Sequence, residues 1–172
     1  MIFETFKRKI LDLYQYWTGL NYNKYIFIST FLILVLTIPF AVLFEFIGIN
    51  EAELGGPKME ELGFGRSFML AVVIAPILET LLGQLIPIKI VQKYVKWKTN
   101  IIAIITSSLF FALGHFSYSF WYFLLILPMG FVLSVTYITF QKRTQSSFWT
   151  TVIVHSARNL IAVLFSIGGL TH

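Results

Sequence analysis

Long apolar runs separated by short polar connections make up most of this chain from residue 25 onward. A helix needs about 20 consecutive apolar residues to cross a hydrocarbon layer about 30 Å thick, and the runs have about that length. We therefore predict an all-α, polytopic membrane helix bundle of about five transmembrane helices. The predicted spans are Tyr25–Ile49, Ser67–Ile90, Asn100–Phe116, a run that follows an aromatic turn and ends at Phe140, and Ser147–Ile167.

The first 24 residues follow a different pattern, with charged side chains between apolar ones that recur at helical spacing, among them Phe6, Ile10 and Leu13. A helix of this kind lies in the membrane interface and is attracted to anionic headgroups. We divide the chain into an interfacial amphipathic helix over residues 1–24 and a transmembrane bundle over residues 25–172. Residues 50–66, which are rich in glutamate and contain Gly-Gly-Pro, are predicted as the one true loop.

Composition agrees with a membrane protein, since hydrophobic residues make up 57% of the chain and charged residues only 12%. A soluble domain does not have this balance. Cysteine is absent, which excludes disulfides, a thiolate nucleophile and a thiolate metal site. The net charge of +5 comes from lysines and arginines at the ends of the spans, so we assign it to membrane topology and expect no nucleic-acid partner.

The basic residues also predict an orientation. Those of the connections fall almost entirely on one side of the predicted bundle, and only Lys58 and Arg66 fall on the other. Cytoplasmic loops of membrane proteins carry such an excess of lysine and arginine. We expect a multi-pass protein of a cell membrane, bacterial in origin, with its amino terminus in the cytoplasm and its carboxyl terminus outside.

One carboxylate, Glu79, lies near the middle of the second apolar run. A charge at that depth costs about 2.5 to 3.5 kcal/mol, which makes an acid there a functional hypothesis with a partner to be found. Of the three histidines, His172 is the terminal residue, whereas His115 and His155 lie in or beside later apolar runs. Asn159 follows His155 by four residues and therefore shares its helix face. We predict that the acid, these two imidazoles and the carboxamide meet inside the bundle.

Such a set of groups can hydrolyse an amide. Glu79 and His115 could hold and deprotonate a water. Donors from His155 and Asn159 could stabilise the oxyanion that forms when this water attacks a carbonyl, at about 3 to 4 kcal/mol for a well-placed donor. The plainer interpretation is that His155 and Asn159 only join helices by hydrogen bonds, worth about 0.6 kcal/mol on average. Phe111 is interpreted as a packing residue.

Three motifs occur in an order that resembles the CPBP family of CAAX-protease and bacteriocin-processing intramembrane endopeptidases, also called the ABI family. A glutamate motif lies on one span, Phe-x-x-x-His on the next and His-x-x-x-Asn two spans later. In this chain they read Glu79-Thr80-x-x-x-Gln84, Phe111-x-x-x-His115 and His155-x-x-x-Asn159. The resemblance covers about residues 75–162, within a core that we place at residues 67–168.

The resemblance implies a glutamate-dependent intramembrane protease that needs no cofactor and acts on a membrane-associated peptide or protein. Glu79 and His115 would activate water, and His155 and Asn159 would form the oxyanion site. The family usually has Glu-Glu-x-x-x-Arg, so Thr80 and Gln84 depart from its pattern. As a hypothesis, Arg158 stands in for the missing arginine or pairs with Glu79. An equal alternative is that its side chain extends to the membrane interface or pairs with polar backbone.

Two other functions remain open at the level of the sequence. A catalytically silent relative could bind and regulate a membrane partner such as a sensor kinase or transporter, or confer bacteriocin immunity, and the altered first motif favours this function. Alternatively, Glu79 and the two histidines could ligate zinc with one position open for water. Metal analysis and a Glu79→Gln variant distinguish the three.

Overall fold

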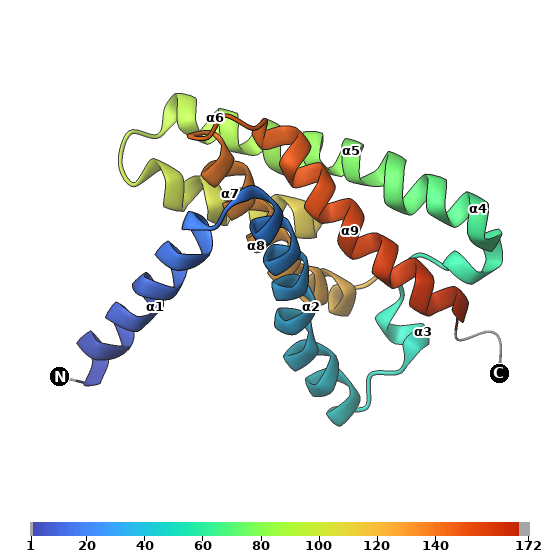
Figure 1. Ribbon diagram of the computed structural model, residues 1–172. Helices are drawn as coiled ribbons and strands as arrows, with labels where there is room; N and C mark the ends of the chain where they lie inside the picture. The colour runs from blue at the N-terminus through green and yellow to red at the C-terminus, as the bar shows by residue number, and fades with distance from the viewer. Residues whose placement is uncertain (1, 169–172) are drawn as a thin grey trace.

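The computed structural model describes residues 2–168, so that Gly169, predicted to end the last span, and His172 lie outside the described residues. The described residues form helices and no strand. Figure 1 shows one helix projecting from a bundle formed by the others. The predicted fold class, a helical membrane bundle, is confirmed. The principal helices are α1 (Ile2–Gly19), α2 (Tyr22–Phe46), a composite helix over residues 63–94, α7 (Thr99–Leu113), α8 (Phe120–Phe140) and α9 (Ser147–Gly168).

Four of the described helices are long and apolar enough to cross a membrane: Tyr22–Phe46, Gly63–Tyr94, Phe120–Phe140 and Ser147–Ser166. The remaining predicted span corresponds to α7, which has 15 residues. At 1.5 Å per residue α7 is about 22 Å long, less than the hydrocarbon thickness. Helix α7 is therefore too short to cross the hydrocarbon layer by itself, and the turn after it contains His115.

The composite helix consists of α4 (Gly63–Ser67), η2 (Phe68–Ile74), α5 (Ala75–Thr80), η3 (Leu81–Leu85) and α6 (Ile86–Tyr94), of which η2 and η3 are π-helical. A proline, Pro76 or Pro87, stands near the start of each α-helical segment that follows a π-helical one. Proline lacks an N–H and its ring crowds the preceding turn, so the wider π turns accommodate it without ending the helix. Such turns are frequent at functional sites, and α5 between them carries Glu79.

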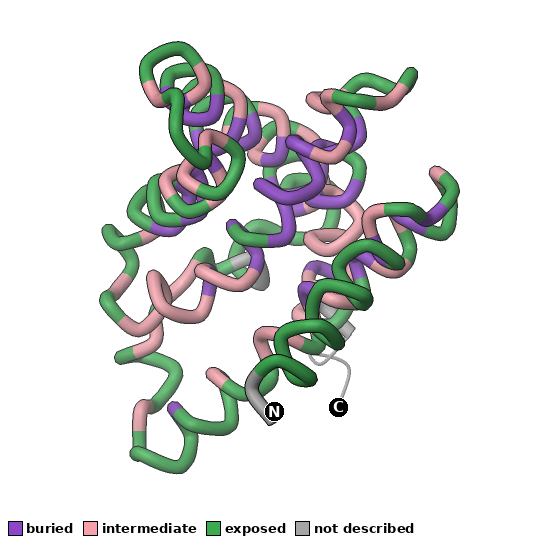
Figure 2. The backbone as a smooth tube through the Cα atoms, turned by 90° about the vertical axis from the view of Figure 1, so that its left-hand side faces the viewer, coloured by how far each residue is buried: buried purple, intermediate pink, exposed green. Residues whose placement is uncertain are grey.

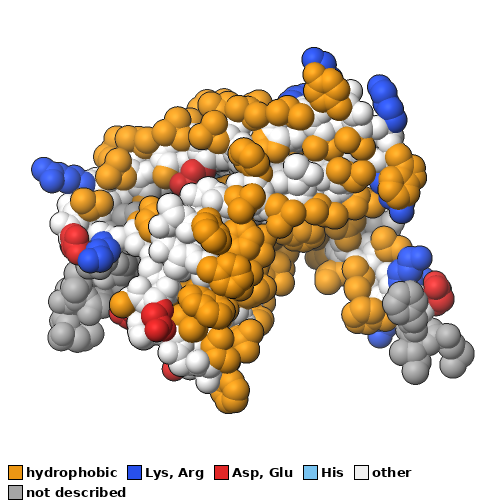
Figure 3. Space-filling model, turned by 180° about the vertical axis from the view of Figure 1, so that it is seen from behind, with side chains coloured by type: hydrophobic (Ala, Val, Ile, Leu, Met, Phe, Trp, Pro, Cys, Tyr) orange, Lys and Arg blue, Asp and Glu red, His pale blue; other side chains and the backbone are white. Residues whose placement is uncertain are grey.

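Helix α8 forms the centre of the bundle, because most of its residues from Ile126 to Phe140 are buried. Its neighbours are α2, α7 and α9. Figure 2 shows the buried residues gathered inside the bundle. Figure 3 shows many hydrophobic side chains on the face turned to the viewer. Large exposed hydrophobic side chains include those of Phe27 and Phe31 on α2. An outer surface of this kind is suited to contact with lipid.

The basic connections of the bundle meet at one end. The Arg143 guanidinium, after α8, donates hydrogen bonds to the carbonyls of Thr18 and Leu20, where α1 ends. The side chains of Gln92 on α6 and Gln141 bond to each other in both directions, at 2.7 and 3.1 Å. The turn between α1 and α2, the end of α6 and the end of α8 are therefore adjacent. Which side of the membrane this end faces stays a prediction.

The region predicted as a loop contains two short helices, α3 (Glu51–Leu54) and η1 (Met59–Leu62), and the composite helix already begins at Gly63. Asn50 caps α3 through a reciprocal capping box with Glu53. This local hydrogen bonding explains why a polar stretch is helical. Gly55 and Gly56 follow at φ +68° and +120°, where a side chain is disfavoured.

Helix α1 begins close to the predicted bound but ends at Gly19, five residues before the predicted bound at residue 24, and α2 begins at Tyr22 rather than Tyr25. Residues 4–16 of α1 are exposed, whereas Trp17 is buried. The Trp17 ring stacks on Tyr25 with centroids 5.8 Å apart, and its Nε1 donates to Ser29. The last turn of α1 is thus fixed to α2 and the rest projects away (Figure 1). Its location in the membrane interface stays a prediction.

Candidate active site

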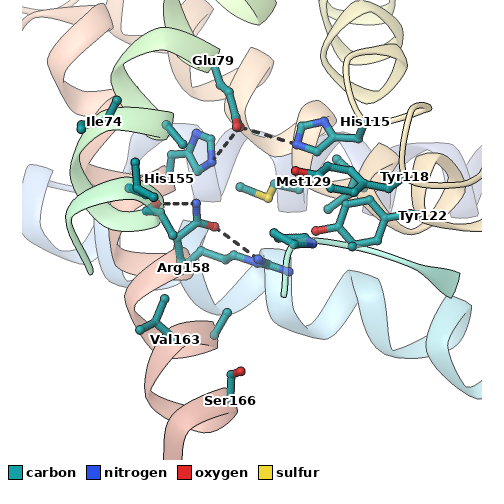
Figure 4. A pocket seen from close by; sticks show the side chains of 18 of the residues that line it. Ile74, Glu79, His115, Tyr118, Tyr122, Met129, His155, Arg158, Val163 and Ser166 are labelled. Atoms are coloured by element: carbon teal, nitrogen blue, oxygen red, sulfur yellow. Dashed lines mark hydrogen bonds and ion pairs between the residues drawn. The ribbon is translucent and has the colours of Figure 1, made fainter. Parts of the chain in front are cut away.

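A cavity of about 650 Å³ lies between the composite helix, the end of α7, α8 and α9. The Gly55-Gly56-Pro57 turn forms part of its wall. Much of the lining is apolar, with leucine, isoleucine, alanine, valine and methionine side chains. Figure 4 shows the polar side chains that point into it. Those that matter below are Glu79, His115, Tyr122, His155, Arg158 and Asn159.

Glu79 lies between the two histidines. Its Oε2 is 3.6 Å from Nε2 of His115 and 3.5 Å from Nε2 of His155. Both separations are longer than a hydrogen bond and short enough for strong electrostatic coupling. The carboxylate side chain is 33% exposed, His115 is 15% exposed and His155 only 1%. The acid thus lies in the cavity wall between a partly exposed imidazole, His115, and a buried one, His155 (Figure 4).

The short α7 explains how His115 reaches the acid. The helix ends at Leu113, and two residues later the His115 ring lies in the turn that follows. Its Nδ1 is 2.9 Å from the Phe111 carbonyl, to which Nδ1–H donates. In a neutral imidazole this bond leaves the lone pair on Nε2, the atom that faces Glu79. Had α7 been a full span, His115 would lie farther from the middle of the composite helix.

The Phe111 ring packs against both histidine rings. Its ring is 3% exposed and lies 5.0 Å from the His115 ring and 5.6 Å from the His155 ring. Glycines of two other helices leave room for it. A Cβ added to Gly83 would lie 2.8 Å from one ring carbon, and one added to Gly130 would lie 3.1 Å from another. Phe111 is a packing residue, as interpreted from the sequence, and it also positions His115 through its carbonyl.

Asn159 lies on the same face of α9 as His155, one turn further on. Its Nδ2 donates to the Ala71 carbonyl at 2.9 Å, and its Oδ1 accepts from Nη1 of Arg158 at 3.2 Å. Because arginine only donates, this contact fixes the orientation of the amide. One N–H of Asn159 remains for another acceptor.

Arg158 points into the cavity, and it is not paired with Glu79. Within the described part of the chain the ion pairs of Glu79 are those with His115 and His155, and no carboxylate lies within ion-pair distance of Arg158. The Nε of Arg158 is buried and has no hydrogen-bond partner among the described residues. The structure therefore does not contain the direct Arg158–Glu79 contact that was one form of the sequence hypothesis.

Thr80 and Gln84, the two positions that depart from the family motif, are fully buried. Neither lines the cavity. Thr80 Oγ1 and both polar atoms of the Gln84 amide lack a hydrogen-bond partner among the described residues. Both side chains lie inside the protein and outside the cavity lining, so a direct contact with substrate in this cavity is not available to them.

Sequence reasoning missed Tyr118 and Tyr122 at the cavity. From the sequence, the aromatic run from residue 116 to 123 is most simply predicted as a belt at the membrane interface. The two tyrosine rings lie 5.3 Å apart and 6.4 and 5.9 Å from the His115 ring. A signal was present, because the two tyrosines are four residues apart, the spacing of one helix face, and they are polar at one end, unlike Phe120 between them. The glycines at 55 and 56 pack against these tyrosines, each at 3.0 Å from an added Cβ.

Among the side chains that the structure describes, no group of three or more His, Cys, Asp or Glu was found that could hold a metal ion. The expectation that the protein needs no cofactor stays a prediction.

A family model described as type II CAAX prenyl endopeptidase Rce1-like matches residues 63–161, more than half of the chain. This chain belongs to the Rce1-like family. No curated protein and no solved structure matches it. The Rce1-like region begins where the composite helix begins and contains Glu79, His115, His155 and Asn159. The resemblance to CPBP endopeptidases is confirmed, and an Rce1-like protein is a multi-pass membrane protein of a protease family whose substrates are membrane-associated.

Proposed function

We propose that this Rce1-like protein is an intramembrane endopeptidase that hydrolyses a peptide bond with a water activated by Glu79 and His115. The observation that carries the proposal is the position of Glu79 Oε2, 3.6 and 3.5 Å from the two histidine Nε2 atoms, at the wall of an apolar cavity. A general base must lie within reach of the proton that it removes, directly or through one water. A water beside Glu79 and His115 would meet this requirement.

The reaction needs no covalent intermediate. As the water oxygen bonds to the carbonyl carbon of the substrate, its proton passes to Glu79. His155 and the remaining N–H of Asn159 stabilise the oxyanion, each by a contribution of about 3 to 4 kcal/mol if well placed. The C–N bond then breaks, and Glu79 returns the proton to the leaving amine. The products are a carboxylic acid and an amine.

The altered first motif does not argue against this chemistry. Thr80 and Gln84 are buried away from the cavity. The regulatory alternative drew its support from these two positions, and neither side chain lines the cavity that holds the proposed reacting groups. We therefore favour the protease over a silent partner-binding relative.

The test is cleavage of a farnesylated CAAX-type peptide with a fluorophore and a quencher on opposite sides of the scissile bond, by the purified protein in liposomes. Glu79→Gln should lower the rate by about 10²- to 10⁴-fold or more, the range expected for loss of a general base. Glu45→Gln, the same change at an exposed carboxylate outside the cavity, should leave it unchanged. A chelator should not lower the rate, and metal analysis should find no stoichiometric zinc. Full activity of Glu79→Gln would refute the proposal and favour a regulatory role.

A further inference from the structure

Thr80, Gln84 and His155 contribute four buried polar atoms that make no hydrogen bond with any residue that the structure describes. They are Oγ1 of Thr80, both polar atoms of the Gln84 amide and Nδ1 of His155. The three side chains are fully buried or nearly so, which removes them from bulk water. Polar groups buried in this way are costly unless they are hydrogen-bonded, and native proteins satisfy nearly all of them. These four atoms therefore need a partner.

The composite helix and α9 run antiparallel, and their register places Thr80 beside His155. Figure 1 shows α9 alongside α4 and α5, and these helices are in contact. Val72 and Val163 belong to one buried cluster, and Glu79 lies next to His155. Seven residues forward along the composite helix, from 72 to 79, thus correspond to eight residues back along α9, from 163 to 155. By this register Thr80 is level with His155.

One face of the composite helix directs Thr80 and Gln84 toward the interior. Buried residues recur every four positions along this face, at Val72, Pro76, Thr80 and Gln84. Residues four apart lie on one side of a helix, and Val72 marks that side as the one packed on α9. Gln84 follows Thr80 by about 6 Å along the axis. A single bridging water, with hydrogen bonds of about 2.7 to 3.2 Å on each side, spans this distance.

The tautomer of His155 decides what kind of partner its Nδ1 needs. Nε2 of this ring is 3.5 Å from Oε2 of Glu79, and an ionised carboxylate only accepts hydrogen bonds. Glu79 therefore favours the tautomer with hydrogen on Nε2, the donor that the oxyanion requires in the proposed reaction. Nδ1 then carries a lone pair and needs a donor. His115 holds the opposite tautomer, because its Nδ1–H donates to the Phe111 carbonyl.

We propose that Thr80 and Gln84 bind a buried water that donates a hydrogen bond to Nδ1 of His155 and so keeps Nε2–H of this ring directed at the reacting carbonyl. The inference rests on the proposed protease function and deepens it. The water donates its second hydrogen to Oε1 of Gln84 and accepts one from the Thr80 hydroxyl. Three hydrogen bonds are the usual number for a buried water. Thr80 and Gln84 are positioning residues in this role, since they act on the substrate only through His155.

The experiment records the ¹⁵N NMR spectrum of the full chain, with labelled histidine, in liposomes at neutral pH and without substrate. The His155 signals are those that His155→Gln lacks. Wild type should show a protonated Nε2 and a bare Nδ1 with the chemical shift of a hydrogen-bonded acceptor. Thr80→Val and Gln84→Met keep the size of the side chain and remove its polar atoms. Each should move the Nδ1 shift toward that of a free lone pair or raise the population of the Nδ1–H tautomer.

Two further variants show whether the effect is specific. Thr80→Ser keeps the hydroxyl and should retain the wild-type Nδ1 shift. Thr30→Val is the matched control, because Oγ1 of Thr30 is also buried with no partner among the described residues. Thr30 lines a separate cavity between α2 and α9, which does not include His155. Its replacement should leave the His155 signals unchanged.

Cleavage of the fluorogenic peptide is the second readout. Loss of one neutral hydrogen bond corresponds to about 2- to 10-fold, so Thr80→Val and Gln84→Met should each lower kcat by about this factor. KM should stay within about twofold, since neither side chain lines the cavity. Thr80→Ser should restore kcat, which a loss of packing alone would not predict.

The wild-type spectrum overturns the proposal, even where a variant does not fold, if Nδ1 of His155 carries hydrogen or accepts no hydrogen bond. The proposal is also wrong if Thr80→Val moves the Nδ1 shift and Gln84→Met does not, because the hydroxyl would then bond to Nδ1 without water. Equal spectra of Thr80→Ser and Thr80→Val would show a purely structural role. Because the spectra need no cleavage, full activity of Glu79→Gln would refute the proposed reaction and leave the water site standing.

Discussion

Replacing Gly83 by alanine should disturb the packing beneath the histidines. The added Cβ would lie 2.8 Å from a ring carbon of Phe111, 3.1 Å from its Cβ and 3.3 Å from its Cα. Carbon atoms in contact normally lie about 3.5 to 4.0 Å apart, so the ring would have to recede by roughly 0.7 Å. Gly130 closes the opposite side of the ring, and the close Cα means that the backbone of α7 must move as well.

The expected packing cost is about 1 to 3 kcal/mol, the range for overpacked cores. Alanine also gains up to about 1 kcal/mol over glycine through helix propensity. Gly65→Ala, in the same composite helix with no atom within 4 Å of an added Cβ, measures this gain alone. The difference between the two variants therefore isolates the packing cost. At about 2 to 4 °C per kcal/mol for a chain of this size, Gly83→Ala should melt roughly 2 to 12 °C below Gly65→Ala.

Thermal unfolding in detergent gives the melting temperatures, and cleavage of the fluorogenic peptide well below both transitions gives the activity. Cleavage by Gly83→Ala should fall even where the protein is fully folded, because a displaced Phe111 carbonyl carries His115 with it. Gly130→Ala should cost at least as much stability, since its Cβ would also meet the Ser108 carbonyl oxygen at 2.9 Å. Equal melting temperatures and equal rates for Gly83→Ala and Gly65→Ala would refute the idea that Phe111 is held tightly between the glycines.

Two further predictions concern other parts of the bundle. Arg143→Gln should free the end of α1, because it removes the charge-assisted hydrogen bonds to the carbonyls of Thr18 and Leu20. Limited proteolysis should then cleave the chain between α1 and α2 faster than in the control Lys142→Gln, a change at the exposed neighbouring residue. Equal cleavage rates of the two variants would contradict this prediction. Gln84→Arg should destabilise the protein by about 3 to 5 kcal/mol as an unpaired buried charge, and adding Thr80→Glu should recover part of the loss. A double-mutant cycle of Thr80→Glu and Gln84→Arg measures their coupling in the free energy of unfolding. A coupling near zero would show that the side chains at positions 80 and 84 do not interact.

The sequence was sufficient to predict the helical bundle and the meeting of Glu79 with two histidines. The length of an apolar run identifies a membrane helix directly. Ionisable side chains within such a helix face the interior of the bundle, because exposing them to lipid is costly. The length of α7 was harder to predict, because the aromatic turn after Leu113 is as apolar as the helix itself. That difference of a few residues decides whether His115 lies beside Glu79 or beyond it.

Contacts between distant parts of the chain were not predictable from periodicity. Gly83 and Gly130 hold the same ring from two different helices, and Asn159 donates to a carbonyl 88 residues away in the sequence. Each helix face can be identified from its own sequence, but which residue of a second helix lies opposite depends on crossing angle and axial shift. The same limit explains why the place of Arg158 relative to Glu79 stayed open until the helices were assembled.

The altered glutamate motif can be understood from the positions of Thr80 and Gln84. The family pattern has an acid and an arginine at these places, four residues apart and so on one side of the helix. In this chain both side chains are neutral and both are fully buried. Loss of only one charge would leave the other unpaired in an apolar interior, which is strongly destabilising, whereas loss of both leaves no charge to balance. No substitute for the arginine is then required behind Glu79, and the guanidinium of Arg158 remains available to the cavity.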